Sequence, residues 1–163
     1  MSTAMSDTGM GLGKNQRAQI KMSDAEVTAF LNDRKIATMC TSNADGSIHA
    51  VAMWYGIVDG CVAFETKLKS QKVANLRRNP NLTVSLEAGE AYEELRGVSL
   101  VGKAEFIEGL DAMWPLGVSV WERYQGEYSD DMRPFIEMML NKRLVVKLNV
   151  ERTITWDHRK LAG

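Results

Sequence analysis

Short alternating segments joined by tight turns are the feature that most restricts what this chain can fold into. Polar and apolar residues alternate through residues 35–41 and 82–86, which is the period of a strand with one buried face. Residues 43–46 and 59–60 carry Asn, Asp and Gly, which favour tight turns between antiparallel neighbours. The six predicted strands are 35–41, 47–58, 61–66, 82–86, 96–108 and 144–155.

Helices are predicted between these strands. Ser23-Asp24-Ala25-Glu26 is a capping box that predicts a helix start, and a basic helix should end before Pro80. Residues 110–125 and 130–142 predict two further helices. We therefore expect a mainly β fold, a six-stranded antiparallel barrel with flanking helices. Its single domain should span residues 23–163, after a flexible N-terminal tail of residues 1–22.

Composition excludes several classes of function. With 163 residues and a net charge of −1, the chain has no basic face broad enough for general nucleic-acid binding. Its apolar runs are too short to span a bilayer, and residues 1–20 lack the apolar segment of a signal peptide. We expect a cytoplasmic protein with free thiols at Cys40 and Cys61, although a disulfide stays open. No metal site is expected, because neither cysteine has a second ligand at zinc-like spacing.

A cluster of positive charge lies between residues 67 and 78. It contains three lysines and two arginines without an acid: Lys67, Lys69, Lys72, Arg77 and Arg78. Ser70 as a helix cap and Lys72 in the first turn would form a receptor for phosphate, because helix N-termini present free N–H groups and partial positive charge. The alternative is a basic helix that simply faces water.

The order of motifs in residues 61–80 resembles the flavin-phosphate segment of the pyridoxamine 5'-phosphate oxidase-like split β-barrel family. The matching positions are Thr66, Ser70-Gln71-Lys72 and the run Asn-Leu-Arg-Arg-Asn-Pro at 75–80. That run is similar to the actinobacterial branch that uses the deazaflavin coenzyme F420. The resemblance covers about residues 23–160 and implies a split barrel that pairs into a homodimer and shares its cofactor groove.

The resemblance also implies where the cofactor binds. In the family, the strand at 50–55 lies along the isoalloxazine ring, largely through backbone groups. His49 and Tyr55 stand where many flavin oxidases have Arg and Lys, which favours F420 over FMN. The implied cofactor-binding residues are Val51, Ala52, Met53, Trp54, Thr66, Lys67, Lys69, Ser70, Gln71, Lys72, Asn75 and Arg78. For Met53 and Trp54 the alternative is core packing.

Charge supports the same choice of cofactor. F420 carries a phosphodiester and an oligoglutamate tail, so it needs more positive charge than FMN, and Lys67 and Lys69 would supply it. Arg77 and Arg78 point ~100° apart around a helix, so at most one of them should face the ligand.

Four aromatic or imidazole side chains are candidates for the substrate side. Trp114 and Trp121 lie on the helix at 110–125, where packing in the core or an interface is the alternative. Trp156 and His158 belong to a C-terminal run that partly resembles the family's ending, close to the active site of the dimer. For His158 the alternative is a solvated histidine in the tail.

Catalytic motifs of hydrolases and metalloproteases are absent from the sequence. Hydride transfer needs few acids and bases, because the cofactor supplies the reactive atom. We therefore expect an F420-dependent oxidoreductase that reduces a small electron-poor organic molecule, with protonation by solvent or a tyrosine. The alternatives are an FMN flavoprotein and a barrel that binds F420, flavin or an apolar ligand without turnover. No catalytic residue is assigned.

Overall fold

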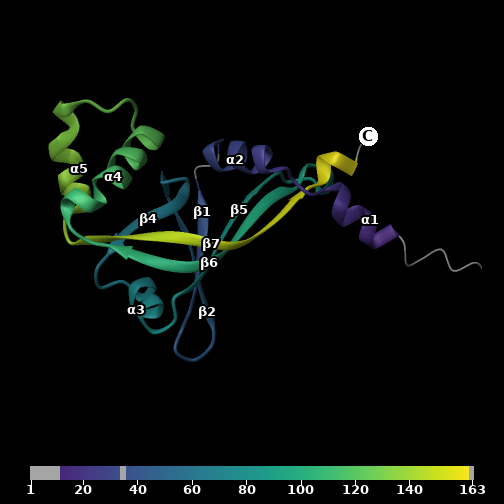
Figure 1. The fold of residues 1–163 in the computed structure, drawn as a ribbon, viewed down its shortest axis with the longest axis horizontal. Helices are drawn as coiled ribbons and strands as arrows, with labels where there is room; N and C mark the ends of the chain where they lie inside the picture. Colours follow the sequence, from purple (N-terminus) through teal and green to yellow (C-terminus); the bar gives the residue numbers. More distant parts are fainter. Residues whose placement is uncertain (1–11, 34–35, 162–163) are drawn as a thin grey trace, which may run out of the picture.

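The computed structural model describes residues 12–33 and 36–161 (Figure 1). One antiparallel sheet curves around the core, and helices flank it. The strands are β1 (Ala37–Ser42), β2 (Ile48–Met53), β3 (Gly56–Val58), β4 (Cys61–Lys67), β5 (Asn81–Ala88), β6 (Arg96–Ile107) and β7 (Arg143–Asp157). The helices are α1 (Leu12–Gln19), α2 (Asp24–Asp33), α3 (Gln71–Arg78), α4 (Leu110–Tyr124) and α5 (Arg133–Leu140), with the 3-10 helices η1 (Tyr92–Glu94), η2 (Asp130–Met132) and η3 (His158–Leu161).

The sheet has seven strands, in the order β2-β1-β5-β6-β7-β4-β3. The expected number of six is therefore wrong, whereas the mainly β class and the antiparallel pairing are confirmed. The extra strand arises because residues 47–58 form two strands instead of one. β2 pairs with β1 at one end of the order, and β3 pairs with β4 at the other.

Helix α4 holds the backbone where this segment divides. The N–H of Tyr55 donates to Tyr124 Oη at 3.1 Å, and the N–H of Ile57 donates to Ser119 Oγ at 2.9 Å. Only two residues separate β2 from β3, although these strands end the order at opposite sides. The sheet must therefore curve until its two ends approach each other, which produces a half-barrel.

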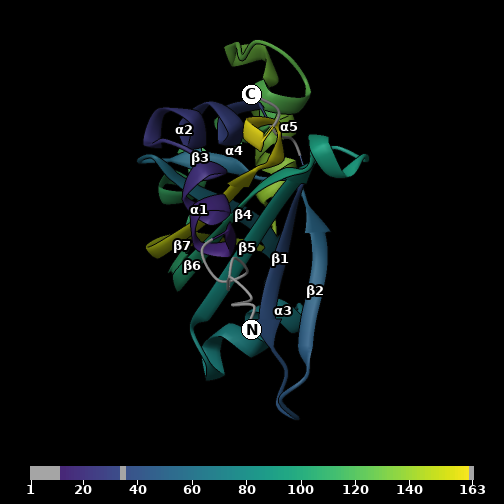
Figure 2. The same cartoon turned by 90° about the vertical axis from the view of Figure 1, so that its right-hand side faces the viewer.

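Two apolar clusters stabilise this curve. Inside it, Met39, Tyr55 and Phe64 are fully buried in the main core. On the outer side, α4 and α5 pack over Ala63 of β4 and Val145 of β7. Both faces of β4 are thus covered, which holds the loop after β4 in a defined place. Figure 2 shows that α3, which follows this loop, lies beside the β1–β2 hairpin.

The N-terminal segment differs from the expected tail of residues 1–22. Residues 1–11 lie outside the described part of the chain, but Leu12–Gln19 form α1. Ile20 then accepts a hydrogen bond at 2.7 Å from the backbone N–H of Asp157, and Met22 is buried. The folded domain therefore begins before residue 23.

Helix α2 starts as the capping box predicts. Ser23 Oγ accepts from the N–H of Glu26 at 3.2 Å, and the Glu26 carboxylate accepts from the N–H of Ser23 at 3.3 Å. These two reciprocal bonds satisfy donors that the first turn would otherwise leave open. Within residues 12–33 and 36–161, no helix is both long and apolar enough to cross a membrane.

Candidate functional site

The N-terminus of α3 follows directly from the end of β4. Ser70 has extended backbone angles and caps the helix, since its Oγ accepts from the N–H of Val73 at 3.3 Å. The hydroxyl of Thr66 lies 3.4 Å from that of Ser70. Because the first N–H groups of a helix have no intrahelical acceptor, those of Gln71 and Lys72 are left for water or a ligand. This is the geometry expected of a phosphate receptor.

Pairing of β4 with β7 brings further cations to this loop. Lys67 lies opposite Arg143, and the N–H of Leu68 donates to the carbonyl of Lys142 at 3.2 Å. A cavity of about 530 Å³ opens here. It is lined by Lys67, Leu68, Lys69, Asn141, Lys142 and Arg143. Four of these six residues are cationic and none is acidic, so the cavity favours an anion.

Lys142 and Arg143 were missed in the sequence analysis. Lys142 immediately precedes β7, and Arg143 is its first residue. Both lie more than seventy residues after Lys67 in the sequence. The one available signal was the pair of adjacent cations at the start of that strand. The strand order β7-β4 was needed to use it, and the sequence does not specify that order.

One acid faces these cations. Glu65 Oε2 lies 3.0 Å from Nη1 of Arg143. Burial raises the pKa of the Glu65 carboxyl, against the attraction of Arg143 and Lys72. Burial lowers the pKa of Lys72, and repulsion by Arg143 lowers it further, while Glu65 opposes this shift. Partial burial thus makes each charge here costlier than in open solvent.

Three other predicted cofactor residues fasten α3 to the sheet. Asn75 is fully buried, and its Nδ2 donates to Thr41 Oγ1 at 3.0 Å and to Asn43 Oδ1 at 2.9 Å. Its Oδ1 accepts from Gln71 Nε2 at 2.8 Å and from Arg78 Nη2 at 3.2 Å. Gln71, Asn75 and Arg78 therefore hold α3 against the turn between β1 and β2. Contact of these side chains with a cofactor stays a prediction.

The predicted ring-binding strand presents alternate residues to its two sides. Val51 and Met53 are partly buried and pack against the main core. Ala52 is exposed, and so is Trp54, which follows the strand. The Trp54 ring stacks on Tyr124 of α4 at a centroid distance of 4.1 Å and an angle of 3°. Of the four predicted residues, only Ala52 and Trp54 thus present side chains outward.

The four substrate-side candidates do not lie together in one chain. Trp114 and Trp121 brace the helical hairpin, where Trp114 meets Tyr128 edge-on at 6.2 Å and Trp121 stacks on Phe135 at 6.0 Å. Trp156 and His158 lie at the other end of β7 (Figure 1).

His158 is also engaged locally. Its Nδ1 is 2.7 Å from the carbonyl oxygen of Tyr92, and the two rings are 4.6 Å apart. β7 runs from residue 143 to residue 157, so Arg143 begins this long strand and His158 follows its opposite end. Within one chain, His158 therefore does not reach the anion site.

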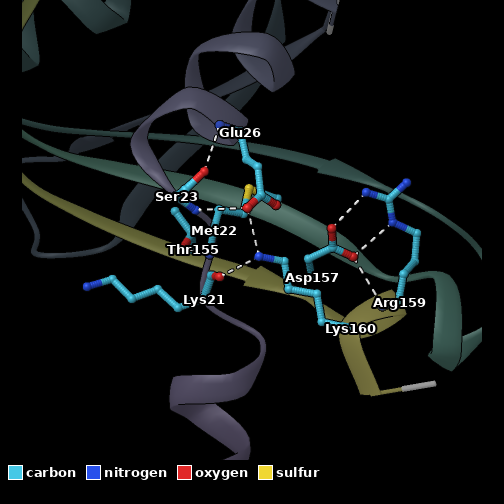
Figure 3. A network of polar contacts seen from close by, with 8 residues as sticks. All are labelled: Lys21, Met22, Ser23, Glu26, Thr155, Asp157, Arg159 and Lys160. Atoms are coloured by element: carbon cyan, nitrogen blue, oxygen red, sulfur yellow. Dashed lines mark hydrogen bonds and ion pairs between the residues drawn. The ribbon is translucent and has the colours of Figure 1, made fainter. Parts of the chain in front are cut away.

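A second polar network joins the two ends of the domain (Figure 3). Lys160 Nζ donates to Glu26 Oε1 at 2.8 Å and to the carbonyl of Lys21 at 2.9 Å. The buried carboxylate of Asp157 accepts from Nε and Nη2 of Arg159 at 2.9 and 2.7 Å. These hydrogen bonds lower the pKa of Asp157. The network secures the segment before α2 on the last strand.

Comparisons with known proteins agree with this architecture. Residues 23–157 match the family described as "Pyridoxamine 5'-phosphate oxidase". The chain belongs to this family. None of the curated proteins matches it in sequence.

Among solved structures of the same fold, a conserved hypothetical protein from Mycobacterium tuberculosis is 49% identical, with a TM-score of 0.88. The match covers 91% of this chain and 92% of that one. A structure named F420 Reductase is 17% identical, with a TM-score of 0.60, and covers 77% of this chain and 93% of that one. The heme storage protein HutZ from Vibrio cholerae is 15% identical, with a TM-score of 0.63, covering 81% and 94%. The last two likenesses support the fold alone.

Proposed function

We propose that this member of the pyridoxamine 5'-phosphate oxidase family is an F420-dependent oxidoreductase that reduces a small electron-poor organic substrate. One observation carries the proposal: the capped N-terminus of α3, with Lys72, adjoins a cavity lined by four cations and no acid. Among the ion pairs of the described residues, none involves Lys67, Lys69, Lys72 or Lys142. This unneutralised charge suits a cofactor with more than one anionic group.

The residues present fit such a cofactor without supplying the chemistry themselves. Bound F420 would supply the carbon that donates hydride. The first turn of α3 would hold the phosphate through backbone N–H groups and Lys72. The outward side of β2, with Ala52 and Trp54, would support the ring. Lys67 and Lys69 would meet the anionic tail, so the protein's task is to position the ring and exclude competing orientations.

Two alternatives use the same site. An FMN flavoprotein would need only the phosphate receptor on α3, without the extra cations. The second alternative is a protein that binds its ligand without turnover. The position of His158, the histidine considered as a proton donor, favours it. Within one chain, His158 lies far from α3 and contacts the Tyr92 carbonyl.

A turnover assay distinguishes the F420-dependent enzyme from the FMN flavoprotein and from the protein that only binds its ligand. The purified protein would be incubated with reduced F420 and a panel of quinones, enones and tetrapyrroles, and oxidation of F420 would be followed by its absorbance. We expect substrate-dependent oxidation with at least one class. A yellow protein with a flavin spectrum would favour FMN, and tight F420 binding without oxidation across the panel would favour a carrier.

We also propose that the protein is a homodimer whose second copy completes the cofactor groove. Residues 149–154 of β7 are all exposed, although they belong to a strand. They include Val150, 42% exposed, and Ile154, 46% exposed. β4 covers β7 only as far as Lys147. A strand with apolar side chains open to solvent is a surface that a second copy would cover.

A further inference from the structure

Glu65 is a carboxylate placed among cations at the proposed anion site. It lies on the outer face of β4, beside Ala63, where α4 and α5 cover the sheet. Its side chain is 21% exposed, and that of its partner Arg143 is 31% exposed. The two are joined by the 3.0 Å ion pair, yet Glu65 Oε2 is buried and accepts no well-aligned hydrogen bond within the described residues. A buried carboxylate oxygen without a well-aligned donor is costly and therefore needs an explanation.

Glu65 and the two cations that act on it most strongly together carry one net positive charge. Lys72 from α3 and Arg143 from β7 act on Glu65, whereas no other acid influences its pKa. Lys147, further along β7, forms an ion pair with Glu105 at 3.2 Å. Glu137 on α5 forms an ion pair with Arg133 at 2.8 Å. Lys67 on β4 and Lys142 before β7 add to the positive side.

We propose that Arg143 binds the anion together with Lys72, and that Glu65 positions Arg143 and competes with the anion for it. The inference rests on the anion site of the proposed function and adds to it a binding residue and a positioning residue. In the free protein, Glu65 offsets the repulsion between the two cations and keeps Arg143 at the mouth of the cavity. A bound anion would also offset the repulsion between Lys72 and Arg143, but it would be repelled by the Glu65 carboxylate.

This arrangement makes anion affinity depend on pH in two ranges. The pKa of Glu65 is raised, so the carboxyl titrates above its ordinary range, and a bound anion favours its neutral form. Binding therefore takes up protons, and affinity falls as pH rises through this titration. The pKa of Lys72 is lowered, so a second fall in affinity comes at alkaline pH as this ammonium deprotonates.

A double-mutant cycle tests the inference. The probe is sulfate, whose charge is constant across the range, and its affinity would be measured by calorimetry from pH 4 to pH 10 at constant ionic strength. We expect Glu65→Gln to tighten binding by about fivefold at neutral pH and to remove the lower inflection only. Arg143→Gln should weaken binding by about tenfold, and by a larger factor in the Glu65→Gln background, because the anion no longer shares Arg143 with a carboxylate there. Glu87→Gln, an equal change of charge at an exposed position of β5, should leave affinity unchanged.

The cycle also shows how the inference would fail. If Arg143→Gln has no effect once Glu65 is replaced, Arg143 serves only to neutralise Glu65 and does not bind the anion. If Glu65→Gln binds sulfate as the parent does and keeps the lower inflection, Glu65 does not compete. Glu65→Asp provides a second variant if Glu65→Gln folds poorly, and it should retain the inflection. Failure of the proposed anion site would give a different result: Lys72→Ala would bind sulfate as tightly as the parent does.

Discussion

Asp157 shows how one side chain secures the end of the domain. It is buried at the end of β7, where Arg159 binds both carboxylate oxygens and the backbone N–H of Asp157 reaches Ile20. Solvent screens the ion pair with Arg159, because the Arg159 side chain is 53% exposed whereas that of Asp157 is 3% exposed. Its contribution should therefore come mainly from hydrogen bonds to a desolvated carboxylate.

We expect Asp157→Asn to lower the free energy of unfolding by about 1–2 kcal/mol at pH 7, after discounting for solvent at Arg159. The lowered pKa of Asp157 means that its contribution is complete above the ordinary aspartate pKa of about 4 and is lost as pH falls below it. Urea denaturation at pH 7, 5, 4 and 3 would measure this. A gap between parent and variant that stays constant down to pH 3 would contradict it.

At the scale of elements, α3 depends on contacts that are distant in sequence. Its buried anchor, Asn75, bonds to Thr41 and Asn43 at separations of 34 and 32 residues. Its N-terminal end, with Ser70 and Lys72, lies near Arg143 at the start of β7. One face of the helix therefore sets its position, and its N-terminus carries the phosphate receptor that we propose.

This division predicts a large loss of stability for one variant of α3 and almost none for another. Asn75→Ala leaves buried polar groups of Thr41 and Asn43 without their donor, so the free energy of unfolding should fall by about 2–3 kcal/mol. Lys72→Ala removes a partly exposed side chain and should change stability by less than about 0.5 kcal/mol. Chemical denaturation of both variants would test this. Equal stability of Asn75→Ala and the parent would show that the buried network does not hold α3.

Elements formed by local signals could be predicted from the sequence. The capping box at Ser23 and Glu26 is made by residues three apart, and it is confirmed. The strand predicted at 82–86 is the centre of β5. The break after Met53 could not be predicted, because the donors of Tyr55 and Ile57 find acceptors on α4 at separations of 69 and 62 residues. Arg143 was missed for the same reason.

At the scale of the whole molecule, the open strand surface is the main feature that one chain does not explain. Ile154 lies within the exposed part of β7. We expect the parent to sediment as a dimer at micromolar concentration and Ile154→Glu to sediment as a monomer, because a charge would be buried in the contact. Met138→Glu is the control, since Met138 is 72% exposed on α5, which packs near Val145 at the start of β7. A monomeric parent would contradict both the dimer and a shared cofactor groove.

We propose that the N-terminus of α3 holds the phosphate of F420. Fluorescence titration of F420 against the parent and Lys72→Ala tests it most directly, with FMN titrated in parallel and Arg77→Ala as the control. Arg77 is a suitable control because it pairs at 3.9 Å with Glu108 and lies over the Phe106 ring. Loss of a charge-assisted hydrogen bond, worth about 1.5–3 kcal/mol, predicts that Lys72→Ala weakens F420 binding by about 10- to 100-fold while Arg77→Ala binds like the parent. Equal affinity of Lys72→Ala and the parent for both cofactors would place the phosphate elsewhere and contradict the account.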